Sequence, residues 1–426
     1  MHEQTVPSVH VPPTLPASAV SRRGFLRAAA VTGGGLVVAT VAACAPNASA
    51  PAWTYGPAAP ASNGVTPPPT AGATPAASMD HGATPAPGAS GAPEYETHDA
   101  NALAVVGRFL DGEYAKVDGL GGQPYGEPKL DGDVKVFELT IDEISHRIDA
   151  LKTPLDALGY NGMWPGPRID VVEGDRVRAI FTNRLRESTG VHFHGQRIPN
   201  NMDGVPHVTQ EPIRPGESFT YEFTARTTGS HMYHSHHNAT DQVGRGLLGA
   251  FIVHPKDPAR RVEQRYGVSQ DIVWISNDSL GGFTINGRGF PATAPIVATR
   301  GDRILVRFMN EGNMMHPWHL HGMPMHVVAR DGYELGAAAF TCDTLGVNPG
   351  ERWDVVIDCE DPGAWAFHCH ILQHVEGQDG MFGMVTAIVI QDAATAAIQA
   401  DTGATAVVAA ATAAGSTALT CKIRTT

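Results

Sequence analysis

Short runs of β-branched and aromatic residues, bounded by turn residues, dominate the hydrophobic pattern of the middle and C-terminal parts of the chain. Examples lie at residues 177–183, 218–224, 304–310 and 353–359, between Pro-Gly and Asp-Pro turns. Long stretches with apolar residues at helical spacing are hard to find. The pattern predicts an all-β fold, in which short strands are joined by tight turns into a sandwich or Greek-key barrel.

The whole pattern occurs twice. Gly-Asp-Arg segments begin at Gly174 and Gly301, and each precedes a His-x-His-Gly segment by 18 residues. Two Pro-Gly-Glu segments each precede a further His-x-His pair by 19 residues. Such self-similarity indicates an internal duplication. It predicts two related domains, domain 1 at residues 95–258 and domain 2 at residues 266–392.

The N-terminus has the pattern of an export signal. A Ser-Arg-Arg-Gly-Phe-Leu segment at residues 21–26 precedes an uncharged apolar run at residues 28–43, which is too short for a comfortable membrane span. The run ends in Val-Ala-Ala-Cys, which resembles a lipid-attachment motif, and a plain cleaved signal is the alternative. We predict a twin-arginine, lipoprotein-type signal at residues 1–44, a lipid anchor at Cys44, and export to the periplasm or cell surface.

Low-complexity segments flank the predicted domains. Residues 45–94 are almost all Ala, Pro, Gly, Ser and Thr, so they cannot bury enough apolar surface to offset the entropy lost on ordering. We predict a disordered linker there. The Ala/Thr-rich tail at residues 393–426 fits either a loose end or a docked helix.

Composition and charge narrow the functional classes. The chain has 426 residues, of which 42% are hydrophobic, and this suffices for two cores. The net charge is −13 and no basic stripe occurs in the domains, so nucleic acid is not an expected partner. Most of the 20 histidines fall in short clusters. His231, His237 and His326 lie near these clusters but off their spacing, and we expect them to be packed or supporting residues.

Four His-x-His pairs occupy matched positions in the two repeats. Alternate side chains of a strand point to the same face, so each pair aims two imidazoles at one point. One pair would be weak evidence, whereas eight converging imidazoles suit copper, iron or zinc. A single zinc takes four ligands and would leave half of them unused, so eight fit a cluster of three metals. The eight are His192, His194, His234, His236, His319, His321, His368 and His370.

These segments resemble the four copper signatures of the multicopper oxidases, and the chain is similar in particular to the small two-domain laccases. The resemblance covers about residues 120–392. It implies two tandem cupredoxin-like Greek-key β-barrels and a type 2 copper bound by His192 and His319. The type 3 copper pair would then be bound by His194, His234, His236, His321, His368 and His370.

Cys369 stands between two of the cluster histidines. In a strand its side chain points to the face opposite to theirs, where a thiolate can bind a separate copper. By the resemblance, His316 and His374 complete a type 1 site with a methionine as weak axial ligand. Electrons taken up there would pass through the histidines beside Cys369 into the cluster. The resemblance thus implies four coppers per chain.

Two methionines compete for the axial position. Met381 lies seven residues after His374, where the family usually has five, so this chain has a two-residue insertion within residues 375–380. The repeat aligns Met381 with Leu247, and we therefore prefer Met381 to Met384.

Domain 1 is predicted to lack a type 1 site. The alignment puts Thr189, Ser235, Thr240 and Leu247 at the four ligand positions, and none of them can serve. A copper nitrite reductase is the alternative function, but its type 1 cysteine lies in the first domain and it lacks the full set of eight histidines. A copper-binding electron-transfer protein, the other alternative, would need only the type 1 site.

The resemblance implies a laccase-type oxidase, which removes electrons from phenols, aromatic amines or metal ions and reduces dioxygen to water. The reduction consumes protons, and Asp203 matches the acidic position close to type 2 copper. The alternative for Asp203 is a turn-forming residue before glycine. Cys342 and Cys359 fit a disulfide and two unpaired thiols equally well.

Each domain supplies four of the eight cluster histidines. The connection between the domains, about residues 258–268, is short, and the two halves would pack with the wrong faces together for an internal cluster. A head-to-tail ring lets domain 1 of one chain meet domain 2 of the next. The resemblance to two-domain laccases implies a homotrimer with a cluster at each interface.

Overall fold

The computed structural model describes residues 94–113, 124–279 and 282–392. These residues belong to one compact unit. The predicted signal and lipid anchor, nearly all of the predicted linker, and the predicted tail lie outside the described residues. Among the described helices, none has the length and hydropathy of a membrane span.

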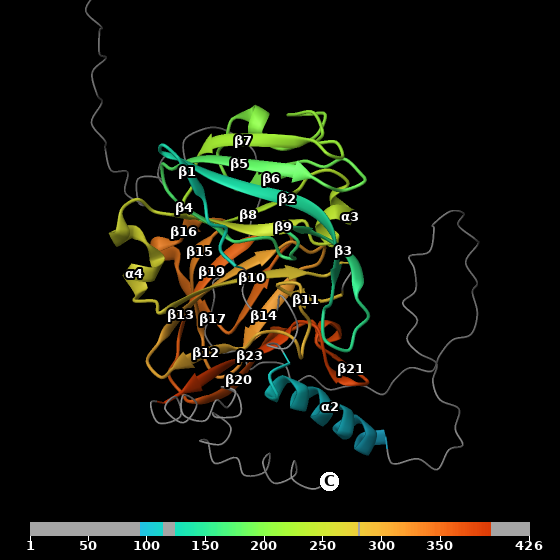
Figure 1. Cartoon of the computed structure of the whole chain (residues 1–426). Helices are drawn as coiled ribbons and strands as arrows, with labels where there is room; N and C mark the ends of the chain where they lie inside the picture. Colours follow the sequence, from blue (N-terminus) through green and yellow to red (C-terminus); the bar gives the residue numbers. More distant parts are fainter. Residues whose placement is uncertain (1–93, 114–123, 280–281, 393–426) are drawn as a thin grey trace, which may run out of the picture. The chain divides into compact units, whose positions relative to one another are not determined.

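The first repeat folds into a five-stranded and a four-stranded sheet that share one core (Figure 1). The five-stranded sheet has the order β1-β2-β5-β7, with β3 on β2, and the four-stranded sheet has the order β4-β9-β8-β6. The strands are β1 (Lys129–Asp131), β2 (Val134–His146), β3 (Leu155–Tyr160), β4 (Ile169–Val172), β5 (Arg176–Asn183), β6 (Val191–His194), β7 (Ser218–Thr224), β8 (Gly229–Ser235) and β9 (Leu248–His254).

The second repeat forms a seven-stranded sheet, a five-stranded sheet and a two-stranded ribbon. The seven-stranded sheet has the order β11-β10-β13-β19-β15-β16, with β17 on β15, and the five-stranded sheet has the order β12-β23-β20-β14-β18. The strands are β10 (Gln270–Asn277), β11 (Thr284–Ile285), β12 (Ile296–Thr299), β13 (Arg303–Asn310), β14 (His316–Leu320), β15 (Met325–Arg330), β16 (Tyr333–Glu334), β17 (Phe340–Cys342), β18 (Thr344–Val347), β19 (Arg352–Asp358), β20 (Gly363–Cys369), β21 (Glu376–Gly377), β22 (Gly380–Met381) and β23 (Val385–Gln391).

The same pairing recurs in both repeats. β2 runs parallel to β5 as β10 runs parallel to β13, and β4 runs parallel to β9 as β12 runs parallel to β23. The remaining pairs are antiparallel. The predicted all-β fold is confirmed, and the four predicted runs are strands β5, β7, β13 and β19.

Burial follows the alternation of side chains along the strands. In β5 every second residue is buried, because a strand presents one face to the core and the other to solvent. The core of the first repeat centres on aromatic rings such as Phe181 and Phe193, and that of the second on Trp274, Trp318 and Phe367.

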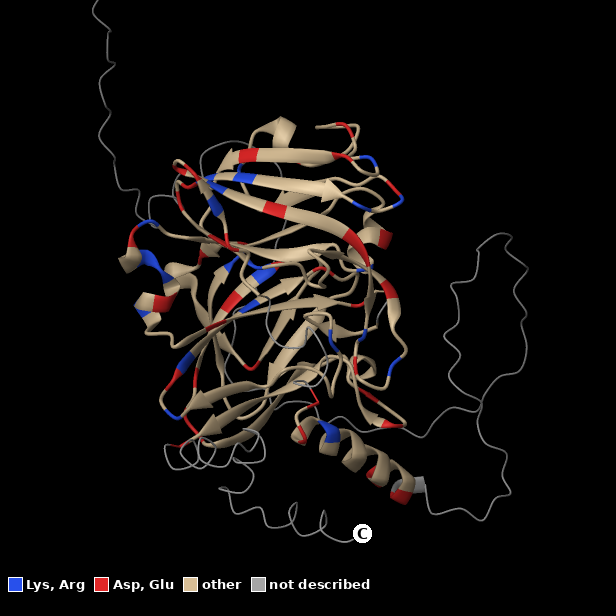
Figure 2. Cartoon of the chain, in the orientation of Figure 1, with Lys and Arg blue, Asp and Glu red and all other residues tan. Residues whose placement is uncertain are grey.

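The two repeats pack on each other within the chain through the four-stranded sheet of the first and the seven-stranded sheet of the second. Met232 and Ile252 share an apolar cluster with Val273 and Ile275. Ion pairs border it. The buried Arg168 guanidinium lies 2.8 Å from Asp271, and buried Arg307 binds Asp271 at 2.7 Å, Asp354 at 3.1 Å, and Glu263. Figure 2 shows basic positions interspersed with acidic ones rather than gathered on one element.

One long helix was not predicted. α2 (Glu94–Leu110) packs against β22, and Phe109 near its end lies 4.9 Å from Phe290, between ring centroids. Among residues 96–110 only Phe109 is buried, so the helix lacks the broad apolar stripe by which an amphipathic helix is found. The other described helices are α3 (Ala239–Gly244), α4 (Val262–Tyr266), η2 (Asn200–Met202), η3 (Pro258–Arg260), η4 (Gly336–Ala338) and η5 (Leu372–His374).

Candidate metal centres

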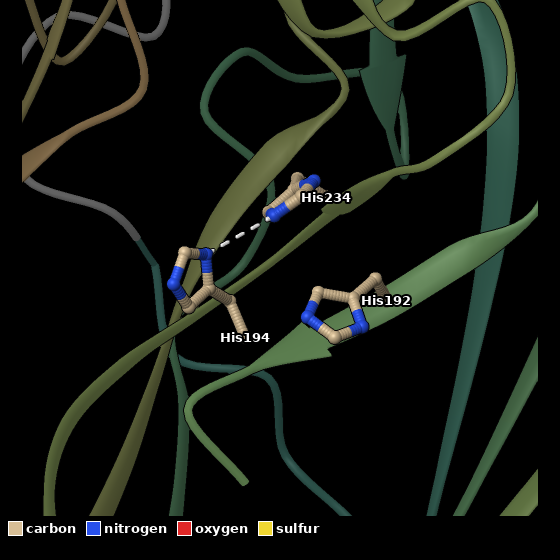
Figure 3. A group of neighbouring side chains, drawn as sticks. All are labelled: His192, His194 and His234. Atoms are coloured by element: carbon tan, nitrogen blue, oxygen red, sulfur yellow. Dashed lines mark hydrogen bonds between the residues drawn. The ribbon is translucent and has the colours of Figure 1, made fainter. Parts of the chain in front are cut away.

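Strands β6 and β8 bring the histidines of the first repeat together. His192 and His234 are direct partners in the antiparallel register, with Val191 and Phe193 buried on the other face of β6. Figure 3 shows three rings turned toward one another, with His194 Nδ1 3.4 Å from His234 Nε2. The His236 ring lies 5.7 Å from that of His192, between centroids. The structure therefore groups all four predicted histidines of domain 1.

Strands β14 and β20 make the matching group in the second repeat. His319 and His368 are register partners, and His321 Nε2 lies 3.1 Å from His368 Nε2. The His370 ring centroid is 5.3 Å from that of His319. Each ring contact among these eight histidines lies within one group, so the described residues form two half-sites of four imidazoles each.

Backbone carbonyls orient the imidazoles in the same way in both half-sites. His192 Nδ1–H donates to the Asp203 carbonyl at 2.8 Å, as His319 Nδ1–H donates to the Asp343 carbonyl at 3.0 Å. His234 and His368 each donate in the same manner to the carbonyl of the residue that follows, at 2.9 Å. The tautomer is fixed by these bonds, which leave the Nε2 lone pair for a metal.

Three histidines of the first half-site have lowered pKa values. Burial, aided by the Arg352 guanidinium, lowers the pKa of His194 to about 3, and burial lowers that of His234 to about 4. Burial is also the main cause that lowers the pKa of His192. Neutral imidazole is the form that binds metal ions, so these side chains are ready to bind at neutral pH.

A third group combines two histidines with Cys369. Cys369 Sγ lies 3.8 Å from His316 Nδ1 and 3.5 Å from His374 Nδ1, and all three side chains are buried. Cys369 is buried whereas His368 beside it is half-buried, so the thiol points to the face opposite to the half-site, as predicted. Asp278, itself buried, lies with Oδ2 3.1 Å from His316 Nε2 and fixes that ring.

These donors fit copper. Ligands that share one ion at bond lengths of about 2.0–2.3 Å, the range for zinc with nitrogen and sulfur, lie about 4 Å apart or less. Cys369 Sγ lies within this distance of both imidazole nitrogens. Two imidazoles and a thiolate are the donor set of an electron-transfer copper site. Burial raises the pKa of the Cys369 thiol to about 11, so the metal must displace its proton on binding.

In the first repeat, a hydrogen-bonded group of polar side chains occupies the position that corresponds to the His₂Cys group. Gln242 Oε1 accepts from Thr189 Oγ1 at 2.8 Å and from Ser235 Oγ at 2.6 Å, and all three residues are buried. Thr240, which the sequence alignment put opposite His374, is exposed. That assignment is wrong, because α3 turns Gln242 inward instead. Thr189 and Ser235 lie where predicted, and none of the three residues offers imidazole or thiolate.

The alignment of Met381 with Leu247 is also wrong. His234 pairs with Leu248 in the register, and His368 pairs with Val385. Ser235 N–H donates to the Leu247 carbonyl at 3.1 Å, and Cys369 N–H donates to the Met384 carbonyl at 3.0 Å. Met384 is therefore the counterpart of Leu247. It is fully buried beside Cys369, whereas Met381 is half-buried in the β21–β22 ribbon.

Two carboxylates adjoin the half-sites. Asp203 Oδ1 lies 3.3 Å from His192 Nδ1, which puts the predicted residue beside a half-site. Asp343, which the sequence analysis missed, accepts from the Thr344 hydroxyl at 3.0 Å, and that hydroxyl is 2.9 Å from His319 Nδ1. The Gly-Asp-Arg repeat gave no signal for it, because Asp203 and Asp343 follow their histidine pairs at different distances. Cys342 and Cys359 are unpaired thiols.

His231 should make the fold sensitive to acid. It is fully buried, its Nε2–H donates to the Thr227 carbonyl at 2.9 Å, and burial lowers its pKa from 6.5 to about 4. The unfolded chain takes up a proton as pH falls through 6.5 and the folded chain does not until about 4, so stability is lost across that window, by about 3 kcal/mol for this group. In the metal-free protein, His231→Gln should flatten the pH dependence of the free energy of unfolding measured in urea. The same change at exposed His98 is the matched control.

Comparisons with known proteins agree with this geometry. Two family models, both described as multicopper oxidase, match residues 145–258 and 262–390. The solved multicopper oxidase mgLAC is 34% identical with a TM-score of 0.57, over 61% of this chain and 86% of that one. The blue copper oxidase of Nitrosomonas europaea is 32% identical with a TM-score of 0.57, over 60% of this chain and 86% of that one.

Curated relatives extend the comparison. Copper resistance protein A of Escherichia coli is 27% identical over 282 residues, which are 52% of this chain and 46% of that protein. The chain spans less than half the length of the curated relatives it matches. One family match on each repeat, together with the copper-type donor sets, shows that the chain belongs to the multicopper oxidase family, whose cofactor is copper.

Proposed function

We propose that the protein is a laccase-type oxidase, which takes single electrons from reducing substrates and uses them to reduce dioxygen to water. The observation that carries the proposal is the coexistence of one buried His₂Cys group with two half-sites of four imidazoles. A carrier of electrons needs only the first. The half-sites add the means to bind further coppers, where a second reactant can be held.

The proposal includes four coppers per chain. The His₂Cys group would hold type 1 copper, and His192 and His319, which share the same Nδ1 arrangement, would hold type 2 copper. The other six imidazoles would hold the type 3 pair. Copper, when bound, supplies one-electron redox chemistry and the place at which dioxygen is reduced.

The chain's own residues link these centres. Cys369 is joined through the backbone to His368 and His370, so a path of covalent bonds leads from the thiolate to two cluster ligands. Asp203 touches His192 and its side chain is about one-third exposed. We propose that it holds a proton for the reduction and exchanges it with solvent.

Met384 is our proposal for the axial ligand, because it occupies the position of Leu247 next to Cys369 and His374. A thioether stabilises oxidised copper, so Met384→Leu should raise the type 1 reduction potential, measured by spectrophotometric titration. The swap conserves volume and should cost less than about 1.5 kcal/mol of stability. Met381→Leu is the matched control, and a rise with that variant alone would restore Met381 as the ligand.

We propose a homotrimer, and the sheets that carry the half-sites support it. The first repeat bears its half-site on β6 and β8, in the sheet that packs on the seven-stranded sheet of the second. The half-site of the second repeat lies on β14 and β20, in the other sheet of that sandwich. Among the described residues no ring contact joins the two half-sites of one chain, whereas a head-to-tail ring can bring half-sites of neighbouring chains together.

The alternative functions have less support. A nitrite reductase-like arrangement would need a type 1 site in the first repeat, where Thr189, Ser235 and Gln242 fill the position. An electron-transfer protein would leave the eight grouped imidazoles without a role. Export by a twin-arginine signal and lipidation of Cys44 remain predictions from the sequence.

Copper analysis and oxygen uptake test the proposal. Copper-loaded protein should contain four coppers per chain, be intensely blue, and consume dioxygen with a phenol or metal-ion donor without releasing hydrogen peroxide. Two coppers per chain, or a colourless oxidised protein, would contradict the assignment of the half-sites or of the Cys369 group.

A further inference from the structure

The proposed type 1 site is closed to solvent on both of its histidines. His316 and Cys369 have no exposed surface and His374 is 1% exposed. His316 is covered on its Nε2 side by Asp278, whose carboxylate also accepts from the backbone N–H groups of Asn313 and Met314 at 2.8 and 2.7 Å. A reducing substrate therefore cannot touch either imidazole in this structure.

An aromatic ring covers His374. The Phe283 ring stacks on the imidazole with centroids 3.9 Å apart and an angle of 17° between the planes. Phe283 is half-buried, and its ring also lies near that of Phe382, at 6.4 Å between centroids. Phe382 is 36% exposed and Leu372, in the turn before His374, is 58% exposed. Two phenyl rings thus lead from His374 to the surface.

Neighbouring residues hold the Phe283 ring over His374. Gly383 has φ of +68°, and a Cβ there would lie 2.3 Å from the His374 carbonyl and 3.2 Å from Phe283, so only glycine fits between them. Phe290 N–H donates to the Gly383 carbonyl at 2.8 Å, and the Phe290 ring in turn contacts Phe109 of α2 at an angle of 37° between the planes. The helix that precedes the first repeat therefore braces the rings over His374.

We propose that Phe283 and Phe382 form the docking site of the reducing substrate, and that this site selects flat aromatic donors, namely phenols and aromatic amines, over hydrated metal ions. The inference rests on the proposed type 1 copper at His374. Aromatic rings gain from offset or edge-to-face contact with a phenyl ring. A hydrated cation gains little there, because a phenyl ring offers it no oxygen ligand.

The proposed electron transfer needs no reactant other than the phenol and the oxidised copper. With oxidised copper bound at His374, a phenol docked on the two rings would lose one electron by way of Phe283 and His374, and it would release its hydroxyl proton to water. The phenoxyl radical would then leave. Phe283 gains no atom and returns to its starting state, so it acts by contact and position alone.

Single-turnover reduction tests the docking site. Under anaerobic conditions the decay of the blue colour is followed with 2,6-dimethoxyphenol and, separately, with hexacyanoferrate(II). Phe283→Leu should keep the copper covered and slow reduction by the phenol about tenfold, the scale of one aromatic contact, while the inorganic donor reacts as before. Phe340→Leu, an exposed phenylalanine of the same repeat, is the control. An unchanged phenol rate, or an equal fall for both donors, would overturn the proposal.

Chemical modification of the metal-free protein tests the cover itself. Diethyl pyrocarbonate should modify His374 slowly in the wild type and fast in Phe283→Ala, with the modified site located by fragment masses, and Phe340→Ala should behave as wild type. If wild-type His374 reacted as fast as exposed His98, the cover would not exist in solution. This assay needs no copper, so a protein that never turns blue would count against the proposed function and leave the cover to be judged separately.

Discussion

Cys369→Ser should abolish the blue colour and reduce substrate oxidation to background while leaving the fold intact. The thiolate is the donor that gives a His₂Cys copper site its colour and its path for electrons, and a serine hydroxyl supplies neither. The matched strand position in the first repeat is Ser235, which is buried and hydrogen-bonded. The strand therefore accepts serine, and the hydroxyl can pair with His316 or His374.

Copper analysis should show three coppers per chain in Cys369→Ser, with the signals of the cluster retained in electron paramagnetic resonance spectra. Cys359→Ser is a matched control, because Cys359 is equally buried, belongs to the same repeat and lies at the end of β19. It should keep the colour and the activity. Oxidation of a phenol by Cys369→Ser at the wild-type rate would mean that electrons enter elsewhere.

Residues that lie within regular strands could be predicted from the sequence. Alternation along a strand fixes which side chains share a face, so His-x-His pairs had to converge and Cys369 had to point away from its neighbours. The structure bears this out at β6, β8, β14 and β20. The internal repeat predicted the second half-site, because the same spacing between motifs places histidines at the same positions of matching strands.

Residues in the loops could not be placed in this way. Between the last half-site histidine and the following strand, the first repeat forms helix α3, whereas the second forms a 3₁₀ turn and the β21–β22 ribbon. Alignment of the two repeats by residue spacing therefore failed for Thr240 and Met381. Gln242 and Met384 occupy the corresponding positions. Hydrogen bonds across the sheet, which no spacing in the sequence records, identify the true counterparts.

In the proposed head-to-tail ring, each cluster combines half-sites from two chains. Variants that damage different half-sites should therefore complement each other. His194→Ala disables the half-site of the first repeat, and His368→Ala disables that of the second. Each variant alone should be inactive, because every interface of its ring contains one damaged half-site. Both variants should still fold, since neither residue lies in the apolar contact between the repeats of one chain.

Co-folding the two inactive variants should restore oxygen uptake. An interface is intact when the first repeat comes from the His368→Ala chain and the second from the His194→Ala chain, so equal random mixing should recover about a quarter of wild-type activity. Co-folding wild type with the double variant gives the same fraction of intact interfaces and calibrates the assay. If the cluster formed within one chain, mixing the single variants would restore nothing, and light scattering would find active monomers.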